Sequence, residues 1–434
     1  MTDATTRTAV LDDLLWRGLV ADSTDLGALR EAAEAAPITL YCGFDPTAPS
    51  LHLGNLLQIL TVRRFQLAGH RPLALVGGAT GLIGDPKMTA ERTLNPKEIV
   101  AGWVAAIRAQ LESFYDFTGP NAAVMVNNYD WTESLSALDL LRDVGKHFSV
   151  NRMLDREAVS ARLASGGISY AEFSYQVLQS YDYVQLSRQY GCTLQTGGSD
   201  QWGNITAGVD LIRRMDGGHV HALTTPLVTK TDGTKFGKTE TGTVWLDPTL
   251  TTPYAFFQFW LNAEDALVTT LLRMFSFRSW EQIEALETAV KERPQAREAQ
   301  RALAEELTDL VHGQPERVRV EAASQALFGQ GELAELDPHT LDAALRATPH
   351  AALTASEFGA GLPVADLLAL SGLIASKGAA RRTISEGGAY LTNVRVSDPA
   401  ALATPSDLLN GRWLVLRRGR RNVGAIEVVA SAPL

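Results

Sequence analysis

Short apolar runs alternate with longer stretches of helical periodicity over the first two hundred residues. The apolar runs, which predict buried strands, cover 38–44, 72–78, 122–128 and 192–198. The stretches with apolar residues at helical spacing, which predict helices, cover 52–69, 96–117, 133–145 and 170–190. This alternation predicts an α/β domain with a parallel sheet covered by helices on both faces. Ligands of such sheets bind at the carboxyl ends of the strands.

The pattern changes after residue 250. Residues 254–328 have mixed charges and no strand signal, which predicts an all-helical segment. Residues 329–362 are rich in Gly, Pro, Ala and Thr without periodicity and predict a linker. From residue 363 the pattern predicts a compact α+β domain with two short helices followed by strands.

Composition restricts the class of protein. The chain has 434 residues, 45% hydrophobic and 20% charged, which is enough for two or three domains with a sizeable core. Two cysteines are too few for a disulfide framework and favour a reducing, cytoplasmic location. We expect neither a signal peptide nor a membrane span, because no apolar run is long enough.

Charge is unevenly distributed. The net charge of −10 argues against nonspecific coating of nucleic acid by the whole surface. Residues 363–434, however, hold nine Lys/Arg and five Asp/Glu, a local balance of +4. A basic patch on the C-terminal domain therefore remains compatible with RNA binding.

The turn after the first predicted strand has features of a phosphate site. His52 and Asn55 lie three residues apart at the start of a helix, so their side chains face the same way. A helix N-terminus presents unpaired N–H groups and partial positive charge to phosphate. Gly54 and Gly43 lack side chains that would keep a nucleotide at a distance. The alternative is a capped helix with a surface histidine.

A second candidate is the polar loop at 226–239. Lys235 and Lys238 lie three residues apart beside glycine and threonine. Such cations can stabilise charge on a leaving pyrophosphate. A solvated hairpin with surface lysines is the alternative.

A third candidate is a polar stripe on the helix at 170–190. Tyr175, Gln179 and Asp182 share one face at spacings of four and three residues. This stripe faces either solvent or a polar ligand, because burying such groups without partners costs about 1–3 kcal/mol each. Asp200, which follows two glycines at a strand–helix junction, is either a helix cap or a ligand for ribose hydroxyls.

These segments resemble a known family. YCGFDPTAPSLHLGN (41–55) and KFGKT (235–239) resemble the two signatures of class I aminoacyl-tRNA synthetases, and FSYQVLQSYD (173–182) with TGGSDQWGNI (196–205) resembles the tyrosyl-tRNA synthetases. Two positions depart from that pattern. Asn55 replaces a second histidine, and Lys87-Met88-Thr89 replaces a serine-glycine-lysine run, so that Lys87 or Arg92 would supply the positive charge there.

The resemblance implies a role for individual residues. Those implied to stabilise the transition state are His52, Asn55, Lys235, Lys238 and Thr47. Those implied to bind tyrosine are Tyr41, Asp85, Tyr175, Gln179, Asp182 and Gln201, with Tyr41 and Asp182 on the phenol hydroxyl. Those implied to contact ATP are Cys42, Gly43, Asp45, Gly54, Gly198, Asp200 and Thr239. ATP would carry Mg²⁺, and no structural metal is expected.

The C-terminal domain resembles the S4-like RNA-binding domain of the same family. Its basic residues, implied to bind RNA, are Lys377, Arg381, Arg382, Arg417, Arg418, Arg420 and Arg421. The expected domains are a Rossmann-like catalytic domain at 1–225, a lysine loop at 226–250, a helical anticodon-binding domain at 251–328, the linker at 329–362 and the S4-like domain at 363–434. The family implies L-tyrosine, ATP and tRNA(Tyr) as partners, and a homodimer.

Three other functions are compatible with parts of this pattern. A tryptophanyl-tRNA synthetase shares the fold, but a tyrosine–aspartate pair aimed at a hydroxyl argues against it. A non-enzymatic RNA-binding protein is opposed by the presence of His52, Lys235 and Lys238. Another nucleotidylyltransferase with the same phosphate turn would not need the arginine-bearing tail.

Overall fold

The structure is a computed structural model that describes residues 4–86, 94–229, 233–234, 236–239, 242–419 and 422–430. The chain forms two compact units. The first comprises Met1–Leu250 with Glu264–Ala299, and the second comprises Thr251–Ala263 with Gln300–Leu434.

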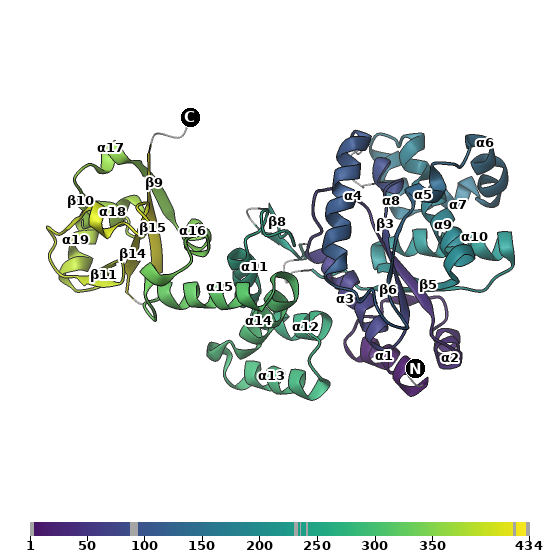
Figure 1. The fold of residues 1–434 in the computed structure, drawn as a ribbon, viewed down its shortest axis with the longest axis horizontal. Helices are drawn as coiled ribbons and strands as arrows, with labels where there is room; N and C mark the ends of the chain where they lie inside the picture. The colour runs from purple at the N-terminus through teal and green to yellow at the C-terminus, as the bar shows by residue number, and fades with distance from the viewer. Residues whose placement is uncertain are drawn as a thin grey trace. The chain divides into compact units, whose positions relative to one another are not determined.

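A mostly parallel sheet organises the first unit (Figure 1). In the described part of the chain its six strands run in the order β1-β6-β5-β2-β3-β4, and only β1 is antiparallel to its neighbour. The strands are β1 (Asp22–Ser23), β2 (Thr39–Phe44), β3 (Arg71–Val76), β4 (Val124–Asn127), β5 (Cys192–Gly198) and β6 (His221–Thr225). The four predicted strands are confirmed. Strand β6 was not predicted, because its two threonines interrupt the apolar run.

Helices pack on both faces of this sheet, as predicted. α3 (Leu53–Leu67) packs against β2, β3 and β5, and α4 (Lys97–Glu112) packs against β3. In Figure 1 these two helices lie on one side of the strands and α9 (Tyr170–Tyr190) and α10 (Trp202–Asp216) on the other. Tyr41 of β2 belongs to the core between the sheet and α9 and α10. Other helices before α9 are α1 (Ala4–Trp16), α2 (Leu26–Ala35), α5 (Tyr129–Thr132), α7 (Val150–Leu154) and α8 (Glu157–Ser165).

The prediction of one helix over 133–145 is wrong. Ser136 caps a single turn, α6 (Ala137–Asp139), which continues as a π-helical turn over Leu140–Val144. A 3₁₀ turn over Gly145–His147 follows. Glycine at the end of the π turn has a low helix propensity, which suits the change in winding.

The all-helical prediction for 254–328 is confirmed, but this segment is not one unit. Its helices are α11 (Pro253–Leu261), α12 (Asp265–Phe275), α13 (Trp280–Glu292), α14 (Glu298–His312) and α15 (Gln314–Leu327). α12 and α13 belong to the first unit, whereas α11 and α15 belong to the second. Arg17 contributes to this division, because its guanidinium donates to the main-chain oxygens of Arg273 and Ser276 at the end of α12.

The predicted linker at 329–362 is also wrong. It contains α16 (Pro338–Arg346), β9 (His350–Thr354) and α17 (Ala355–Phe358). β9 pairs in parallel with the last strand of the C-terminal sheet. The C-terminal fold therefore begins before residue 363.

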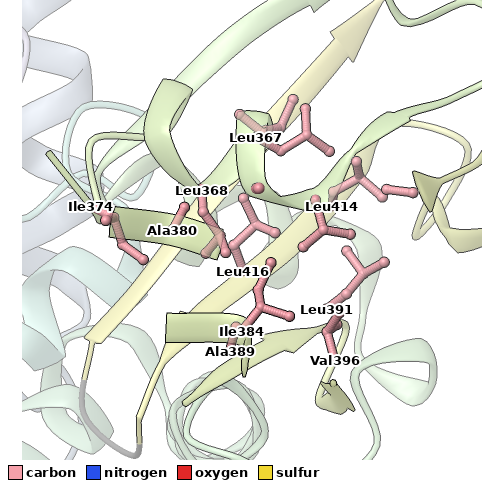
Figure 2. Close-up of a cluster of buried hydrophobic side chains, with 14 of the residues drawn as sticks. Leu367, Leu368, Ile374, Ala380, Ile384, Ala389, Leu391, Val396, Leu414 and Leu416 are labelled. Carbon is pink, nitrogen blue, oxygen red and sulfur yellow. The ribbon is translucent and has the colours of Figure 1, made fainter. Parts of the chain in front are cut away.

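The C-terminal sheet has the order β12-β11-β14-β15-β9. Its elements after α17 are β10 (Leu362–Pro363), α18 (Val364–Leu370), α19 (Lys377–Ser385), β11 (Ala389–Leu391), β12 (Val394–Val396), β13 (Leu402–Ala403), β14 (Trp413–Arg418) and β15 (Asn422–Val429). Figure 2 shows side chains of α18 and α19, including Leu367 and Ile384, packed against Leu414 and Leu416 of β14. This core confirms the predicted compact α+β pattern.

No helix in the described ranges is both long and apolar enough to cross a membrane.

Candidate active site

The turn after β2 forms a capped helix start. His52 Nδ1 accepts from the Gly54 N–H at 3.1 Å, and Asn55 Oδ1 accepts from the His52 N–H at 3.1 Å, which completes a capping box. Because His52 Nδ1 accepts, the ring proton lies on Nε2. A Cβ at position 54 would come within 2.9 Å of the His52 ring, so glycine is required beside it. The capping alternative for this motif is therefore confirmed, and the phosphate role of His52 and Asn55 stays a prediction.

The lysine loop returns beside this turn. The Leu53 N–H donates to Val244 O at 3.2 Å, and the Leu246 N–H donates to Leu51 O at 2.9 Å. Trp245 lies next to His52, with ring centroids 6.1 Å apart. The main chain of the first signature and the main chain that follows the second are thus neighbours.

The loop itself is partly described. β7 (Lys238–Thr239) pairs with β8 (Gly242–Thr243), and the Phe236 ring lies 6.2 Å from that of Phe275. Lys235, together with Lys87 and Arg92, lies outside the described residues. For Lys238 and Thr239 the structure describes the main chain alone.

Asp182 lies buried on α9, with 2% of its surface exposed. Asn128 Nδ2 donates to one carboxylate oxygen and Trp131 Nε1 to the other, both at 2.9 Å. Burial raises the pKa of Asp182 to about 7, the negative charge of Asp45 adds to that rise, and the two hydrogen bonds oppose it. The carboxylate is thus held in place and titrates close to neutrality.

Tyr41 of β2 is a second buried polar group, close enough for the charge of Asp182 to act on it. Its side chain is 1% exposed, and among the described residues its hydroxyl has no hydrogen-bond partner. Burial, and then the charge of Asp182, raise the pKa of Tyr41 well above its ordinary value, so the hydroxyl stays protonated. A buried hydroxyl without a partner costs about 1–3 kcal/mol, which a bound polar ligand would recover.

A chain of hydrogen bonds connects Asp182 to Tyr175. Asn128 Nδ2 donates to Thr80 Oγ1 at 2.8 Å, and Thr80 donates in turn to Asp45 Oδ1 at 2.7 Å. The Tyr175 hydroxyl donates to Asp45 Oδ2 at 2.7 Å. The structure therefore places Asp45, which was expected beside ATP, among the residues expected to bind tyrosine.

A third carboxylate, Asp85, joins the same region. It accepts from Gln201 Nε2 at 3.0 Å and from Asn204 Nδ2 at 3.2 Å. Gln179, one turn before Asp182, has a buried Oε1 that finds no partner in the described part of the chain. Asp85 and Gln201 therefore supply an acceptor and an amide close to the α9 stripe, and Gln179 is part of the stripe itself.

The other residues expected to lie near ATP are partly exposed and partly buried. Gly43, Thr47, Gly54 and Asp200 are exposed. Asp200 lies inside a 3₁₀ turn whose cap is Gly198, and Gln201 caps α10, so the capping role considered for Asp200 is excluded. Cys42 is buried, and burial raises the pKa of its thiol to about 12.

Asn128 and Trp131 were missed from the sequence. Asn128 directly follows β4 and Trp131 lies in α5 just after it, at the carboxyl edge where ligands of parallel sheets bind. The sequence did contain a signal for them, because NNYDW (127–131), a run of side chains with hydrogen-bonding groups, begins at the end of the predicted strand.

The basic residues of the C-terminal domain do not form one exposed set. Arg381, Arg382 and Arg418 are exposed, and the exposed Lys377 pairs with Asp366 at 2.8 Å. Arg417 is 7% exposed and stacks 4.6 Å from the centre of the Tyr390 ring, so its assignment to an exposed RNA-binding cluster is wrong. Arg420 and Arg421 lie outside the described residues. Within the described ranges, no three His, Cys, Asp or Glu side chains are grouped to hold a metal ion.

Comparison with known proteins identifies the family. Residues 33–329 match the model of class I tRNA synthetases specific for Trp and Tyr, and residues 342–425 match that of the C-terminal domain of tyrosine–tRNA ligases. The tyrosine–tRNA ligase of Streptomyces avermitilis is 64% identical over 97% of this chain and 99% of its own length. That of Mycobacterium tuberculosis is 57% identical over 96% and 98%.

Solved structures agree. A C-terminally truncated mitochondrial tyrosyl-tRNA synthetase of Coccidioides posadasii matches with a TM-score of 0.64 and 30% identity, over 72% of this chain and 90% of its own. Because the family models cover residues 33–329 and 342–425 and the relatives match almost the whole chain, the chain belongs to the tyrosine–tRNA ligase family of class I aminoacyl-tRNA synthetases.

Proposed function

We propose that this chain activates L-tyrosine with ATP and transfers the tyrosyl group to tRNA(Tyr), using the pocket around Asp182. The observation that carries the proposal is the pair of buried groups, Asp182 and Tyr41, in a family whose members are tyrosine–tRNA ligases. Asp182 accepts a hydrogen bond from the substrate hydroxyl, and the Tyr41 hydroxyl completes the hydrogen bonding of that oxygen. Phenylalanine would leave the Tyr41 hydroxyl unpaired and deprive Asp182 of the hydrogen bond from the ligand; tyrosyl-specific synthetases are the usual example of such discrimination.

The ammonium group of the substrate is assigned to the acidic end of the same pocket. Tyr175, Gln179, Asp85 and Gln201 hold it. Asp45 supports this assignment, because its carboxylate orients the Tyr175 hydroxyl. These contacts fix the substrate carboxylate for attack.

Two steps follow from this arrangement. A carboxylate oxygen of tyrosine attacks the α-phosphorus of ATP in line, the bond to the β-phosphate oxygen breaks, and pyrophosphate leaves. A hydroxyl of the terminal ribose of tRNA then attacks the carbonyl carbon, and AMP leaves. Neither step uses a covalent enzyme intermediate.

The phosphate-binding groups stabilise the charge that develops in the first step. We assign this role to His52 Nε2–H, the Asn55 amide, Lys235 and Lys238, with Thr47 assisting from the turn. Gly43, Gly54, Gly198, Asp200, Thr239 and Cys42 are assigned to the nucleotide. Mg²⁺ enters with ATP as part of the substrate.

We further propose a cytoplasmic homodimer that binds tRNA through the exposed basic residues of α19. The exposed apolar side chains Leu138, Leu141 and Val150 of the first unit support a protein interface. Sedimentation of the full chain tests the dimer, which would be excluded by a monomer at micromolar concentration.

Amino-acid-dependent exchange of pyrophosphate into ATP tests the main proposal. Exchange should require tyrosine and be negligible with phenylalanine or tryptophan. Asp182→Asn, which keeps the size of the side chain and removes its charge, should lose most tyrosine-dependent exchange. Stimulation by tryptophan instead, or tRNA binding without any exchange, would overturn the proposal.

A further inference from the structure

The turn between β11 and β12 touches a helix outside the C-terminal sheet. Asn393 Nδ2 in this turn donates to the Ala326 main-chain oxygen, near the end of α15, at 2.7 Å. Thr392 and Asn393 have positive φ angles of 45° and 66°, a conformation that asparagine tolerates better than most residues. The strained turn thus presents its amide to a helix C-terminus, where carbonyl groups lack intrahelical partners.

Arg417 strengthens the same contact. Its guanidinium packs so closely on the main chain of Gly329 that a Cβ at this position would collide with it. Gly329 has a φ of 82°, so the site favours glycine on two grounds. The other face of Arg417 lies over Tyr390 of β11. A buried cation near the carboxyl end of α15 also interacts favourably with the helix dipole.

A second attachment involves β15 and the start of β14. Glu427 of β15 accepts from Arg346 of α16 and from Arg412, both at 2.8 Å. Asp342 of α16 accepts from the Trp413 indole at 3.1 Å. α16 in turn packs against α15.

Two separate attachments restrain the orientation of a domain, because a single one would permit rotation about it. We propose that Asn393 and Arg417 are positioning residues for tRNA charging: together with the α16 ion pairs they hold the C-terminal sheet on α15 as one body. The basic helix α19 is then presented to tRNA in a preset orientation, and binding does not have to order a loosely tethered domain. The inference rests on the proposed tRNA binding by this domain.

Asn393→Gly tests the proposal with little risk to folding. Glycine keeps the positive φ and removes the hydrogen bond to Ala326. Asn410→Gly is a matched control, because Asn410 is an exposed asparagine of the same domain with a φ of 51°. Arg417→Met provides a second arm, since Arg417 is too buried to contact RNA itself.

Three measurements separate docking from catalysis. Asn393→Gly should raise the KM for tRNA by about two- to tenfold, the effect of one lost hydrogen bond. Arg417→Met should raise it at least as much, and tyrosine-dependent pyrophosphate exchange should stay unchanged in both. Cleavage by a glutamate-specific protease at the exposed Glu332 and Glu335, which lie between α15 and α16, should become faster.

Equal behaviour of Asn393→Gly and Asn410→Gly in charging and in proteolysis would overturn the inference. A chain lacking 348–434 distinguishes this failure from failure of the proposed function. If that chain charges tRNA normally, the domain does not serve charging and the proposed function of the domain fails. If it loses charging while Asn393→Gly matches its control, only the docking inference fails.

Discussion

The indole of Trp131 allows a direct test of how the buried carboxylate works. Trp131→Phe removes the N–H that donates to Asp182 at 2.9 Å and leaves an aromatic ring in its place. A hydrogen bond to a charged group contributes about 1.5–3 kcal/mol, and about 1.4 kcal/mol corresponds to one pKa unit. The pKa of Asp182, about 7 in the unsubstituted protein, should therefore rise by about one to two units.

The sign of the effect follows from the hydrogen bond to the ligand. The ionised carboxylate can accept a hydrogen bond from the tyrosine hydroxyl through either oxygen, which the protonated carboxyl cannot do. The affinity for tyrosine should therefore fall as the pH decreases through the pKa of Asp182. The unsubstituted protein should bind tyrosine about tenfold more weakly at pH 6 than at pH 8. At pH 7.5, a pKa raised to about 8.5 lowers the ionised fraction, and hence the affinity, by about eightfold.

Equilibrium dialysis with labelled tyrosine between pH 6 and pH 8.5 measures both effects. Trp260→Phe, at a buried tryptophan of the other compact unit, is the control for a lost indole. Affinity that does not vary with pH in the unsubstituted protein would refute the reasoning. A loss of tyrosine affinity in Trp131→Phe that is the same at every pH would also refute it.

Three further predictions concern other parts of the chain. Lys235→Ala should slow adenylate formation in single-turnover experiments while the Kd for tyrosine changes less than about twofold, and a large loss of tyrosine binding would contradict its role. Removing 348–434, which includes β9 and so leaves no broken sheet, should spare pyrophosphate exchange and abolish charging; unchanged charging would count against RNA binding by the domain. His70 is fully buried, accepts from the Ile38 N–H and has a pKa lowered by burial. The contribution of the neutral His70 to the free energy of unfolding should therefore be present above pH 6.5 and be lost below it. In urea unfolding, His70→Gln should reduce the difference in the free energy of unfolding between pH 5.5 and pH 7.5.

Local patterns predicted the α/β core and the positions of the main motifs. Apolar runs fixed β2 to β5, and the helical stripe of Tyr175, Gln179 and Asp182 gave α9 at its observed bounds. These features depend on periodicity within one element, which a single sequence contains.

Features that depend on distant partners were not predictable in this way. Trp131 acts through Asp182, fifty-one residues later, and no local pattern links the two. β9 is stabilised by pairing with β15, which lies about seventy residues further on, so its segment alone resembled a linker. Arg417 looked like a surface charge because only the folded domain places it between Tyr390 and Gly329.

The phosphate turn shows a different limit. His52 and Asn55 were given alternative roles as helix caps or phosphate ligands, and the structure confirms the capping box. The two roles use different atoms, because capping employs acceptors and phosphate requires donors. The capping box therefore does not exclude the phosphate role, which stays a prediction.

A crystal structure of the full chain with bound L-tyrosine tests the central claim most directly. We predict the phenolic oxygen at about 2.7 Å from both an Asp182 carboxylate oxygen and the Tyr41 hydroxyl, as in ordinary O–H···O bonds. A tyrosine ring bound with its hydroxyl away from Asp182, or bound outside the pocket lined by Tyr41, would contradict the account.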